Sequence, residues 1–284
     1  LGDLLHLDKP HIQSRLKTML EYKNLELGGC YHQAPMSYPA LLSWCEKKAE
    51  QFAPYITDTG NYIAAALSNH QKVVLEAQLG AMRDIDYGIF PYTSSSSTIS
   101  AYGPIGAGIP GTLPDHIVGV LKAYSTCVGA GPFTAEKAMP EKWMESLRKS
   151  GGEYGAATGR PRRVGPFDAV ASAYGLKCQN ADKIALTKLD VLSHMDEIPV
   201  ITSYKLNDEI ITEFDPLDDL DSMTPVIQML PGWNTDISKC RKYEELPENA
   251  RKYIETLEHL LNHEIQFISV GAERNQYLTK GEWL

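Results

Sequence analysis

Residues 183–190 read Lys183-Ile184-Ala185-Leu186-Thr187-Lys188-Leu189-Asp190, a short apolar run that ends in polar side chains. The apolar part predicts a buried strand. A helix is predicted before it, over Asp168–Ala181. An amphipathic helix over Leu246–His263 and a strand over Ile265–Val270 are predicted after it. Alternating strands and helices indicate an α/β fold with a mainly parallel central sheet flanked by helices.

Outward from this centre, helical spacing of apolar residues predicts helices near the amino terminus, over His11–Leu25 and Tyr38–Phe52. Lys72–Ala77 predicts a short buried strand, and His116–Val128 a helix that passes into a strand. A hairpin is predicted about Asn207-Asp208, between the alternating runs Val200–Leu206 and Glu209–Phe214. With no repeat or linker evident, residues 1–284 are expected to form a single α/β domain.

Charge and composition restrict the class of partner. The chain has 284 residues, a net charge of -9, and 27 Lys and Arg against 36 Asp and Glu. Nucleic acid and anionic membranes require a broad positive field, so neither is expected as a partner. Five scattered cysteines and the lack of an apolar run of about 18 residues predict a cytoplasmic protein with reduced thiols.

Gly151-Gly152-Glu153-Tyr154-Gly155-Ala156-Ala157-Thr158-Gly159-Arg160-Pro161-Arg162-Arg163 combines four glycines with three arginines. Guanidinium groups match carboxylate and phosphate oxygens, and glycines let backbone amides approach a ligand closely. No acidic residue lies between the arginines, so this segment predicts an anion-binding loop. The alternative is a flexible surface loop with scattered basic residues.

Thr187-Lys188-Leu189-Asp190 resembles the N-K-x-D element of GTP-binding proteins and follows a predicted strand, as that element does. A fixed carboxylate at Asp190 can accept from both N1–H and the exocyclic amine of guanine, a donor pair that adenine lacks at that edge. The alkyl stem of Lys188 can cover the face of the base. An aspartate that caps a helix after a strand is the alternative interpretation.

Several motifs occur in one order along the chain, and together they resemble the adenylosuccinate synthetase family over essentially all 284 residues. They match the carboxyl-terminal two-thirds or so of that family. Besides the arginine segment and residues 187–190, these motifs are Gly2-Asp3-Leu4, Asp84-Ile85-Asp86, Ser94-Ser95-Ser96, Val128-Gly129-Ala130-Gly131-Pro132-Phe133, Pro231-Gly232-Trp233 and Ile268-Ser269-Val270-Gly271.

The resemblance implies a GTP-dependent carbon–nitrogen ligase of purine (AMP) biosynthesis with a P-loop-NTPase-like fold. Such an enzyme condenses IMP with L-aspartate: the 6-oxygen of IMP is phosphorylated, and the aspartate amine then displaces the phosphate. It further implies Mg²⁺, a cytoplasmic homodimer, and small-molecule substrates rather than nucleic acid or membrane.

By the same resemblance, individual residues take ligand-binding roles. The positions matched to the family's sites are Thr158, Arg160 and Arg162 for aspartate; Leu79, Ser94, Val128 and Arg160 for IMP; and Lys188, Asp190, Ser269 and Gly271 for GTP.

Four positions depart from the family pattern: Leu79, Ala157, Pro161 and Cys127 replace the usual glutamine, threonine, arginine and arginine. The family's phosphate loop, catalytic Asp and His, and Mg²⁺ ligands match positions upstream of Leu1. The fold is therefore expected to be incomplete at its amino terminus and the chain alone inactive, with no metal ligand of its own. Two alternatives stay open: a diverged paralogue with another purine or amino donor, and a non-catalytic guanine-nucleotide-binding or assembly module.

Overall fold

A computed structural model describes residues 1–281 and 283. The chain divides into two compact units, which are described in turn. The first contains residues 1–74 and 107–109, and the second contains residues 75–106 and the chain from 110 onward. The single domain expected over residues 1–284 stays a prediction. Within the described residues, no helix combines the length and apolar character needed to cross a membrane.

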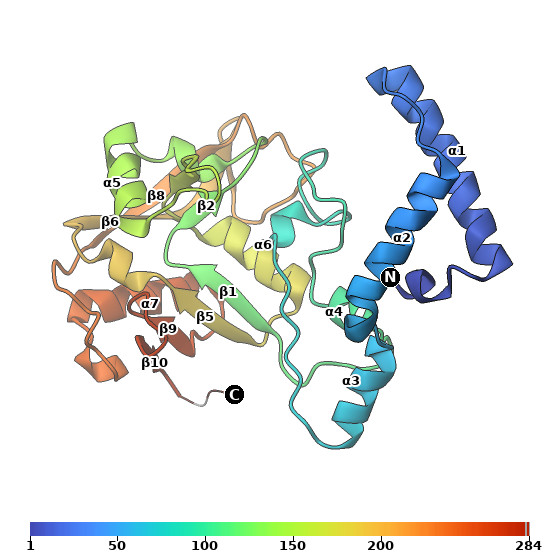
Figure 1. Cartoon of the computed structure of the whole chain (residues 1–284). Helices are drawn as coiled ribbons and strands as arrows, with labels where there is room; N and C mark the ends of the chain where they lie inside the picture. Colours follow the sequence, from blue (N-terminus) through green and yellow to red (C-terminus); the bar gives the residue numbers. More distant parts are fainter. Residues whose placement is uncertain (282, 284) are drawn as a thin grey trace. The chain divides into compact units, whose positions relative to one another are not determined.

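The first unit is helical, as the spacing of its apolar residues predicts. Ser37 and Asp58 cap its second and third α-helices by accepting hydrogen bonds from Ala40 N at 3.4 Å and Asn61 N at 3.0 Å. The elements are a 3₁₀ helix (Gly2–His6), α1 (Pro10–Tyr31), α2 (Tyr38–Phe52), a 3₁₀ helix (Ala53–Tyr55) and α3 (Thr59–Ser68), drawn in blue to cyan in Figure 1.

The second unit contains a four-stranded sheet in the order β1-β5-β9-β10. Its first three strands are parallel: Lys122 of β1 pairs with Thr187 of β5, and Leu186 of β5 pairs with Ile268 of β9. β10 is antiparallel to β9. The strands are β1 (Val118–Lys122), β5 (Lys183–Thr187), β9 (Phe267–Ser269) and β10 (Tyr277–Thr279) (Figure 1). The prediction of an α/β fold is therefore confirmed.

A second four-stranded sheet is built around β6, which pairs in parallel with β4 and antiparallel with β7 and β8. Asn207 and Asp208 join β6 to β7 with φ of 48° and 71°, the left-handed backbone of a tight hairpin turn, which confirms the predicted hairpin. The strands of this sheet are β4 (Phe167–Asp168), β6 (Glu197–Leu206), β7 (Glu209–Ile211) and β8 (Thr224–Pro231). A separate antiparallel pair consists of β2 (Ser125–Cys127) and β3 (Arg163–Gly165).

Helices cover these sheets through apolar faces. α7 (Glu248–Leu261) follows Pro247 and buries Tyr253, Ile254 and Leu257 along one face. Each such side chain contributes about 1.5–3 kcal/mol on burial. The Tyr253 hydroxyl donates to Ala123 O at 2.7 Å, which satisfies its polar atom in the core. The other helices are α4 (Tyr102–Gly106), α5 (Glu141–Gly151), α6 (Ala169–Gln179) and 3₁₀ turns at Ala81–Arg83, Thr134–Lys137, Leu189–Leu192 and Tyr243–Glu245.

α6 contacts β1 of the first sheet, β6 of the second sheet, and α7. Its approach to β1 is close: a Cβ on Gly119 would lie 2.5 Å from Cδ2 of Leu176. A larger residue at that point of β1 would force the Leu176 side chain to move, so glycine allows the close approach of α6.

The strand predicted over Lys72–Ala77 is wrong. This segment has no regular secondary structure, and Val74 is 89% exposed. The apolar, β-branched composition of the run favours a strand, but a strand also needs a neighbour with which to form hydrogen bonds. None of the described residues pairs with this segment.

The helix predicted at the start of His116–Val128 is also wrong. Strands β1 and β2 occupy this region, separated by a bend at Ala123 and Tyr124. Its apolar run was too short to distinguish a helix from a strand by periodicity. Parallel pairing with β5, more than sixty residues later in the chain, decides the conformation.

Candidate functional site

The carboxyl ends of β1, β5 and β9 meet at one edge of the first sheet. Lys122 ends β1, Lys188 and Asp190 follow β5, and Ser269 ends β9. The register aligns these ends, and β9 contacts the turn that carries Asp190. Ligands of open α/β sheets bind beyond the carboxyl ends of the strands, so this edge is the candidate site.

The turn after β5 is held in an uncommon conformation. The backbone of Lys188 lies in the left-handed region with φ of 62°, which residues other than glycine rarely adopt. The Thr187 hydroxyl donates to Leu121 O at 3.0 Å, and the fully buried Leu189 anchors the turn in the core. Asp190 is then half-buried, and this burial raises the pKa of its carboxyl group.

β9 contacts this turn and ends at Ser269, and Gly271 follows two residues later. The Ser269 hydroxyl donates to Gly271 O at 3.1 Å. A Cβ on Gly271 would lie 2.2 Å from Oε1 of Gln276, so a larger residue there would displace the Gln276 side chain. The structure thus places β9, which ends at Ser269, against the turn that carries Asp190, and Gly271 is linked to Ser269 by that hydrogen bond.

The arginine segment forms a narrow loop. Tyr154 and Pro161 pair across its base, Gly155 N donates to Arg160 O at 2.8 Å, and Gly159 turns the tip with φ of 65°. Thr158 lies at this exposed tip, where its hydroxyl accepts from Arg160 N at 3.4 Å. Backbone hydrogen bonds therefore shape the loop, and the side chains at its tip stay on the surface.

No acidic residue lies between the arginines in the sequence, but two of the three are paired with carboxylates in the structure. Arg162 binds Glu153, with Nη1 2.9 Å from Oε2, and Arg163 binds both carboxylate oxygens of Glu136. The Arg160 side chain is exposed, and within the described residues it makes no hydrogen bond or ion pair. Folding supplies the carboxylates from outside the arginine run, so the sequence between the arginines could not reveal them.

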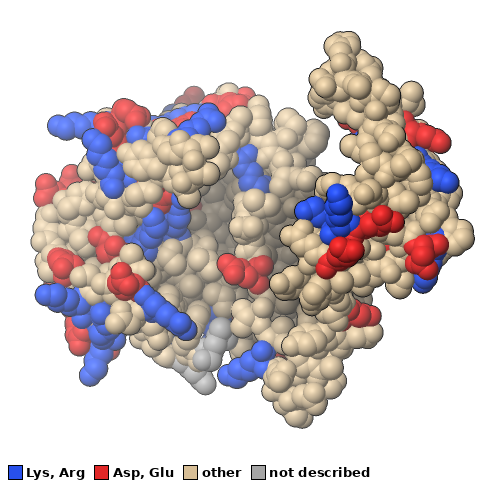
Figure 2. All heavy atoms as spheres, in the orientation of Figure 1, with Lys and Arg blue, Asp and Glu red and all other residues tan. Residues whose placement is uncertain are grey.

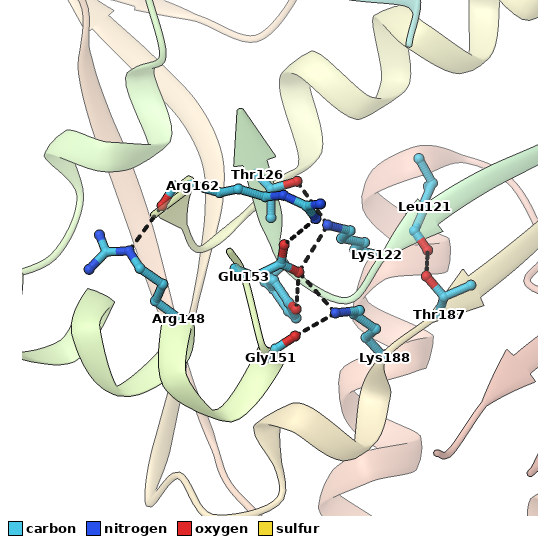
Figure 3. Close-up of polar contacts among 10 residues, drawn as sticks. Leu121, Lys122, Thr126, Arg148, Gly151, Glu153, Arg162, Thr187 and Lys188 are labelled. Atoms are coloured by element: carbon cyan, nitrogen blue, oxygen red, sulfur yellow. Dashed lines mark hydrogen bonds and ion pairs between the residues drawn. The ribbon is translucent and has the colours of Figure 1, made fainter. Parts of the chain in front are cut away.

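Glu153 is the centre of a buried charge cluster (Figure 3). Its side chain is fully buried, and its Oε1 accepts from Tyr124 Oη at 2.6 Å, Lys122 Nζ at 2.9 Å and Lys188 Nζ at 3.0 Å. Burial alone would raise the pKa of Glu153, but hydrogen bonds from Tyr124, Lys122 and Lys188 outweigh it and lower the pKa to about 2. Glu153 is therefore ionised at neutral pH, and it connects β1, the arginine loop and the turn after β5.

Three of the four residues matched to IMP binding, Leu79, Ser94 and Val128, come from two segments that Arg83 joins. Arg83 donates to Tyr92 O at 2.5 Å, to Ala130 O and Val128 O at 3.1 Å, and to the Cys127 thiol at 2.9 Å. Ser94 lies next to this junction, because its N donates to Arg83 O at 2.7 Å.

Val128 is exposed at the end of β2, one residue beyond Cys127, which pairs with Arg163. The exposed Leu79 adopts φ of 80° just before Gly80, which begins the turn that carries Arg83. Arg83 and the β2–β3 pairing thus bring Ser94 and Val128 towards the arginine loop.

Sequence reasoning missed Glu153, Lys122 and Arg83. Glu153 carried one signal, since it is the sole acidic residue of the 151–163 segment. Lys122 was hidden by the wrong helix prediction, which removed it from the end of a strand. Arg83 had no signal, because all its acceptors are backbone carbonyls and a thiol contributed by distant segments.

Residues 1–281 and 283 contain no group of three or more His, Cys, Asp or Glu side chains placed to hold a metal ion.

Comparison with known proteins identifies the family. The adenylosuccinate synthetase family profile matches residues 1–278. The chain is 40% identical over 271 residues to the adenylosuccinate synthetase of Carboxydothermus hydrogenoformans, and 35% identical over 279 residues to that of Staphylococcus saprophyticus. These matches cover 95% and 98% of this chain, but 63% and 65% of those proteins, so the chain spans just under two-thirds of their length.

A solved structure agrees. The structure of fully ligated adenylosuccinate synthetase from Plasmodium falciparum superimposes with a TM-score of 0.87 at 32% sequence identity, covering 99% of this chain and 65% of that one. Both the sequence and the fold lead to one conclusion: the chain belongs to the adenylosuccinate synthetase family.

Proposed function

We propose that the protein represented by this chain is a GTP-dependent carbon–nitrogen ligase that condenses IMP with L-aspartate to form adenylosuccinate, in AMP biosynthesis. Family membership supports the proposal. The observation that carries it is the position of the arginine loop beside the carboxyl edge of the sheet. Lys188 Nζ, from the turn that carries Asp190, donates to Gly151 O at 2.6 Å, just before that loop.

In this proposal, the GTP base lies at the carboxyl ends of β5 and β9. The ionised Asp190 accepts from N1–H and the amine of guanine, and backbone groups near Ser269 and Gly271 complete the pocket. The stem of Lys188 covers the base while its ammonium stays on Glu153 and Gly151. The fixed ammonium leaves the alkyl carbons as the part of Lys188 available to the base.

L-Aspartate is proposed to bind the arginine loop near Thr158, Arg160 and Arg162. Arg160 and Arg162 offer forked donors for its carboxylates, and the Thr158 hydroxyl offers a further hydrogen bond. Two cations facing two carboxylates leave the amine of the ligand free. Held in this way, the neutral amine attacks C6 of IMP and displaces the phosphate that GTP has placed on the 6-oxygen.

IMP is proposed to bind next to this loop, near Leu79, Ser94, Val128 and Arg160. Mg²⁺ is proposed as the cofactor of the whole protein, where it would neutralise phosphate charge. A cytoplasmic homodimer is proposed on family membership alone. Nucleic acid is not a proposed partner, because the net charge is -9 and, on the face in Figure 2, Lys and Arg are mixed with Asp and Glu.

A second candidate keeps the ligase chemistry and changes the purine or the amino donor. It is favoured by Leu79, which is exposed where the family has a glutamine, and by Ala157, which lacks a hydroxyl at the loop tip. Assays of the full-length protein with several purine monophosphates and amino acids decide between the two. Strict use of IMP and L-aspartate would exclude this second candidate.

Titration calorimetry of the purified chain tests the nucleotide site. GDP is expected to bind more tightly than ADP, and Asp190→Asn is expected to abolish that preference, because the amide cannot accept from both guanine donors. Asp219→Asn, an exposed substitution in the acidic 215–221 segment, is the matched control. Equal binding of GDP and ADP by the unmodified chain would contradict the proposal. Absence of any nucleotide binding would leave a structural or assembly role.

A further inference from the structure

Lys188 and Arg162 bind the same carboxylate, although they belong to elements that we assign to different ligands (Figure 3). We propose that Glu153 is a positioning residue that couples the guanine element to the arginine loop. Binding of a guanine nucleotide at residues 188–190 then orders the loop that receives the dicarboxylate, and the dicarboxylate in turn strengthens nucleotide binding. The identity of the two ligands rests on the proposed function, whereas the link itself rests on the contacts of Glu153.

Glu153 is held firmly enough that a shift of one of its partners changes the positions of the others. Its side chain has no exposed surface, and its two oxygens accept four hydrogen bonds from side chains. Its backbone is held as well, because its N donates to Arg148 O and its O accepts from Arg162 N, both at 2.9 Å. Glu153 thus lies at the junction of α5 and the arginine loop, where displacement of one partner is felt by the others.

Its cationic partners are only partly buried, and this exposure lets them reach a ligand. The side chains of Lys122, Arg162 and Lys188 are 27%, 34% and 36% exposed, whereas that of Glu153 is 0% exposed. Three cations surround one carboxylate, so the cluster carries an excess of positive charge that favours an incoming anion. The cluster is therefore suited to share a cation with a bound ligand.

Arg162 is the cation best placed to be shared. It contacts Oε2 of Glu153, whereas the two lysines contact Oε1. If Arg162 turns to a ligand carboxylate, Glu153 keeps Lys122, Lys188 and Tyr124 as donors, so its buried charge is not left unpaired. The carboxylate then interacts more strongly with the remaining lysines, which gives the coupling a positive sign.

Lys188 transmits this effect to the guanine element. Its ammonium bridges Glu153 Oε1 and Gly151 O, and its backbone is in the left-handed region two residues before Asp190. A residue other than glycine keeps a left-handed backbone only when the contacts around it stabilise that conformation. Tightening the ammonium on Glu153 therefore orders the turn that presents Asp190.

Hydrogen exchange followed by mass spectrometry tests the link in the 284-residue chain without any ligand. Lys188→Met is expected to speed exchange at amides 155–162, because it releases Gly151 O at the base of the loop. Arg162→Met is expected to slow exchange at amides 189–193, because Glu153 then holds Lys188 more tightly; each change should be about fivefold or more. Arg163→Met is the matched control: it removes a neighbouring arginine that binds Glu136, and should leave amides 189–193 unchanged. Effects confined to the segment of each substitution would overturn the proposal.

Adding GDP separates this link from the proposed function. In the unmodified chain GDP is expected to slow exchange at amides 155–162, and in Glu153→Gln that slowing is expected to vanish while GDP still binds. A fold-stabilising role alone would not remove this ligand-dependent change.

If GDP does not bind but the reciprocal effects of Lys188→Met and Arg162→Met persist, the proposed function fails and the link stands. If GDP binds with guanine preference and those effects are absent, the link fails alone. The cation variants keep Glu153, so they decide the matter even if Glu153→Gln does not fold.

Discussion

The Tyr204 hydroxyl donates a 2.7 Å hydrogen bond to Oδ2 of Asp168, which joins β6 to the residue that caps α6. The other oxygen of Asp168 accepts from Ala171 N at 3.0 Å, and both Tyr204 and Asp168 are buried. Tyr204→Phe removes one donor from a buried carboxylate, so we expect a loss of about 1–3 kcal/mol in the free energy of unfolding. Urea denaturation measures this, with the exposed Tyr55→Phe as control. Equal stability of the two variants would contradict it.

Asp168 also predicts a pH dependence. Burial raises its pKa from 3.8 to about 6, against hydrogen bonds from Tyr204 and backbone amides. Because the folded-state pKa is raised, Asp168 contributes fully to the free energy of unfolding below pH 3.8, and this contribution is lost as the pH rises through about 6. Asp168→Asn keeps an oxygen cap and does not titrate. The stability of the unmodified chain relative to this variant should therefore fall by up to about 3 kcal/mol between pH 4 and 7. A constant difference in urea denaturation across that range would refute this.

For Glu153 we expect the opposite dependence of stability on pH. Its folded-state pKa is lowered from 4.5 to about 2, so its contribution is present above pH 4.5 and is lost as the pH falls through about 2. Glu153→Gln should cost about 2 kcal/mol at pH 7, less than for a fully buried ion pair because the cations are partly exposed. The cost should shrink as the pH is lowered towards 2. Glu145→Gln, an exposed partner of Lys149, should change nothing measurable. A cost that does not vary with pH would disprove this account.

Guanine binding should depend on the ionisation of Asp190. Burial raises the pKa of this carboxyl group, and only its ionised form accepts from both guanine donors. The affinity for GDP should therefore increase as the pH rises from about 4 to 7. Calorimetry at several pH values measures this, with ADP as the internal reference. Asp190→Asn should bind GDP with little pH dependence, and an unchanged profile in that variant would point to another group.

The two arginines of the proposed aspartate site should behave differently. Arg160→Gln removes an exposed side chain and should weaken L-aspartate binding, measured in the presence of IMP, by about tenfold or more, with no change in melting temperature. Arg162→Gln should weaken binding and also lower the melting temperature, because Arg162 is part of the Glu153 cluster. Equal melting temperatures for the two variants would remove the structural role assigned to Arg162.

Elements governed by local rules were predictable from the sequence. The α7 helix follows from apolar spacing after Pro247, and the β6–β7 hairpin follows from Asn207-Asp208, whose side chains tolerate the left-handed backbone of its turn. The α2 helix has the same bounds as its prediction, Tyr38–Phe52. These signals lie within a few residues of the structure that they determine.

Elements that depend on distant partners were not predictable. β1 is a strand because β5 pairs with it, whereas residues 72–77 have a strand-like composition and no such neighbour among the described residues. The site shows the same limit: the motif around Asp190 is local, but the carboxylate that holds Arg163 comes from Glu136, 27 residues earlier in the chain. Sequence patterns therefore indicated candidate ligand-binding residues, and folding determined which of their charges stay free.

Arg83 restricts how this protein can diverge. One guanidinium holds Tyr92 O in one loop and the Cys127 thiol, Val128 O and Ala130 O in another. An insertion or deletion in either loop would shift acceptors that the other loop depends on. We therefore expect a length change in either loop to be tolerated only where it leaves these acceptors in reach of Arg83.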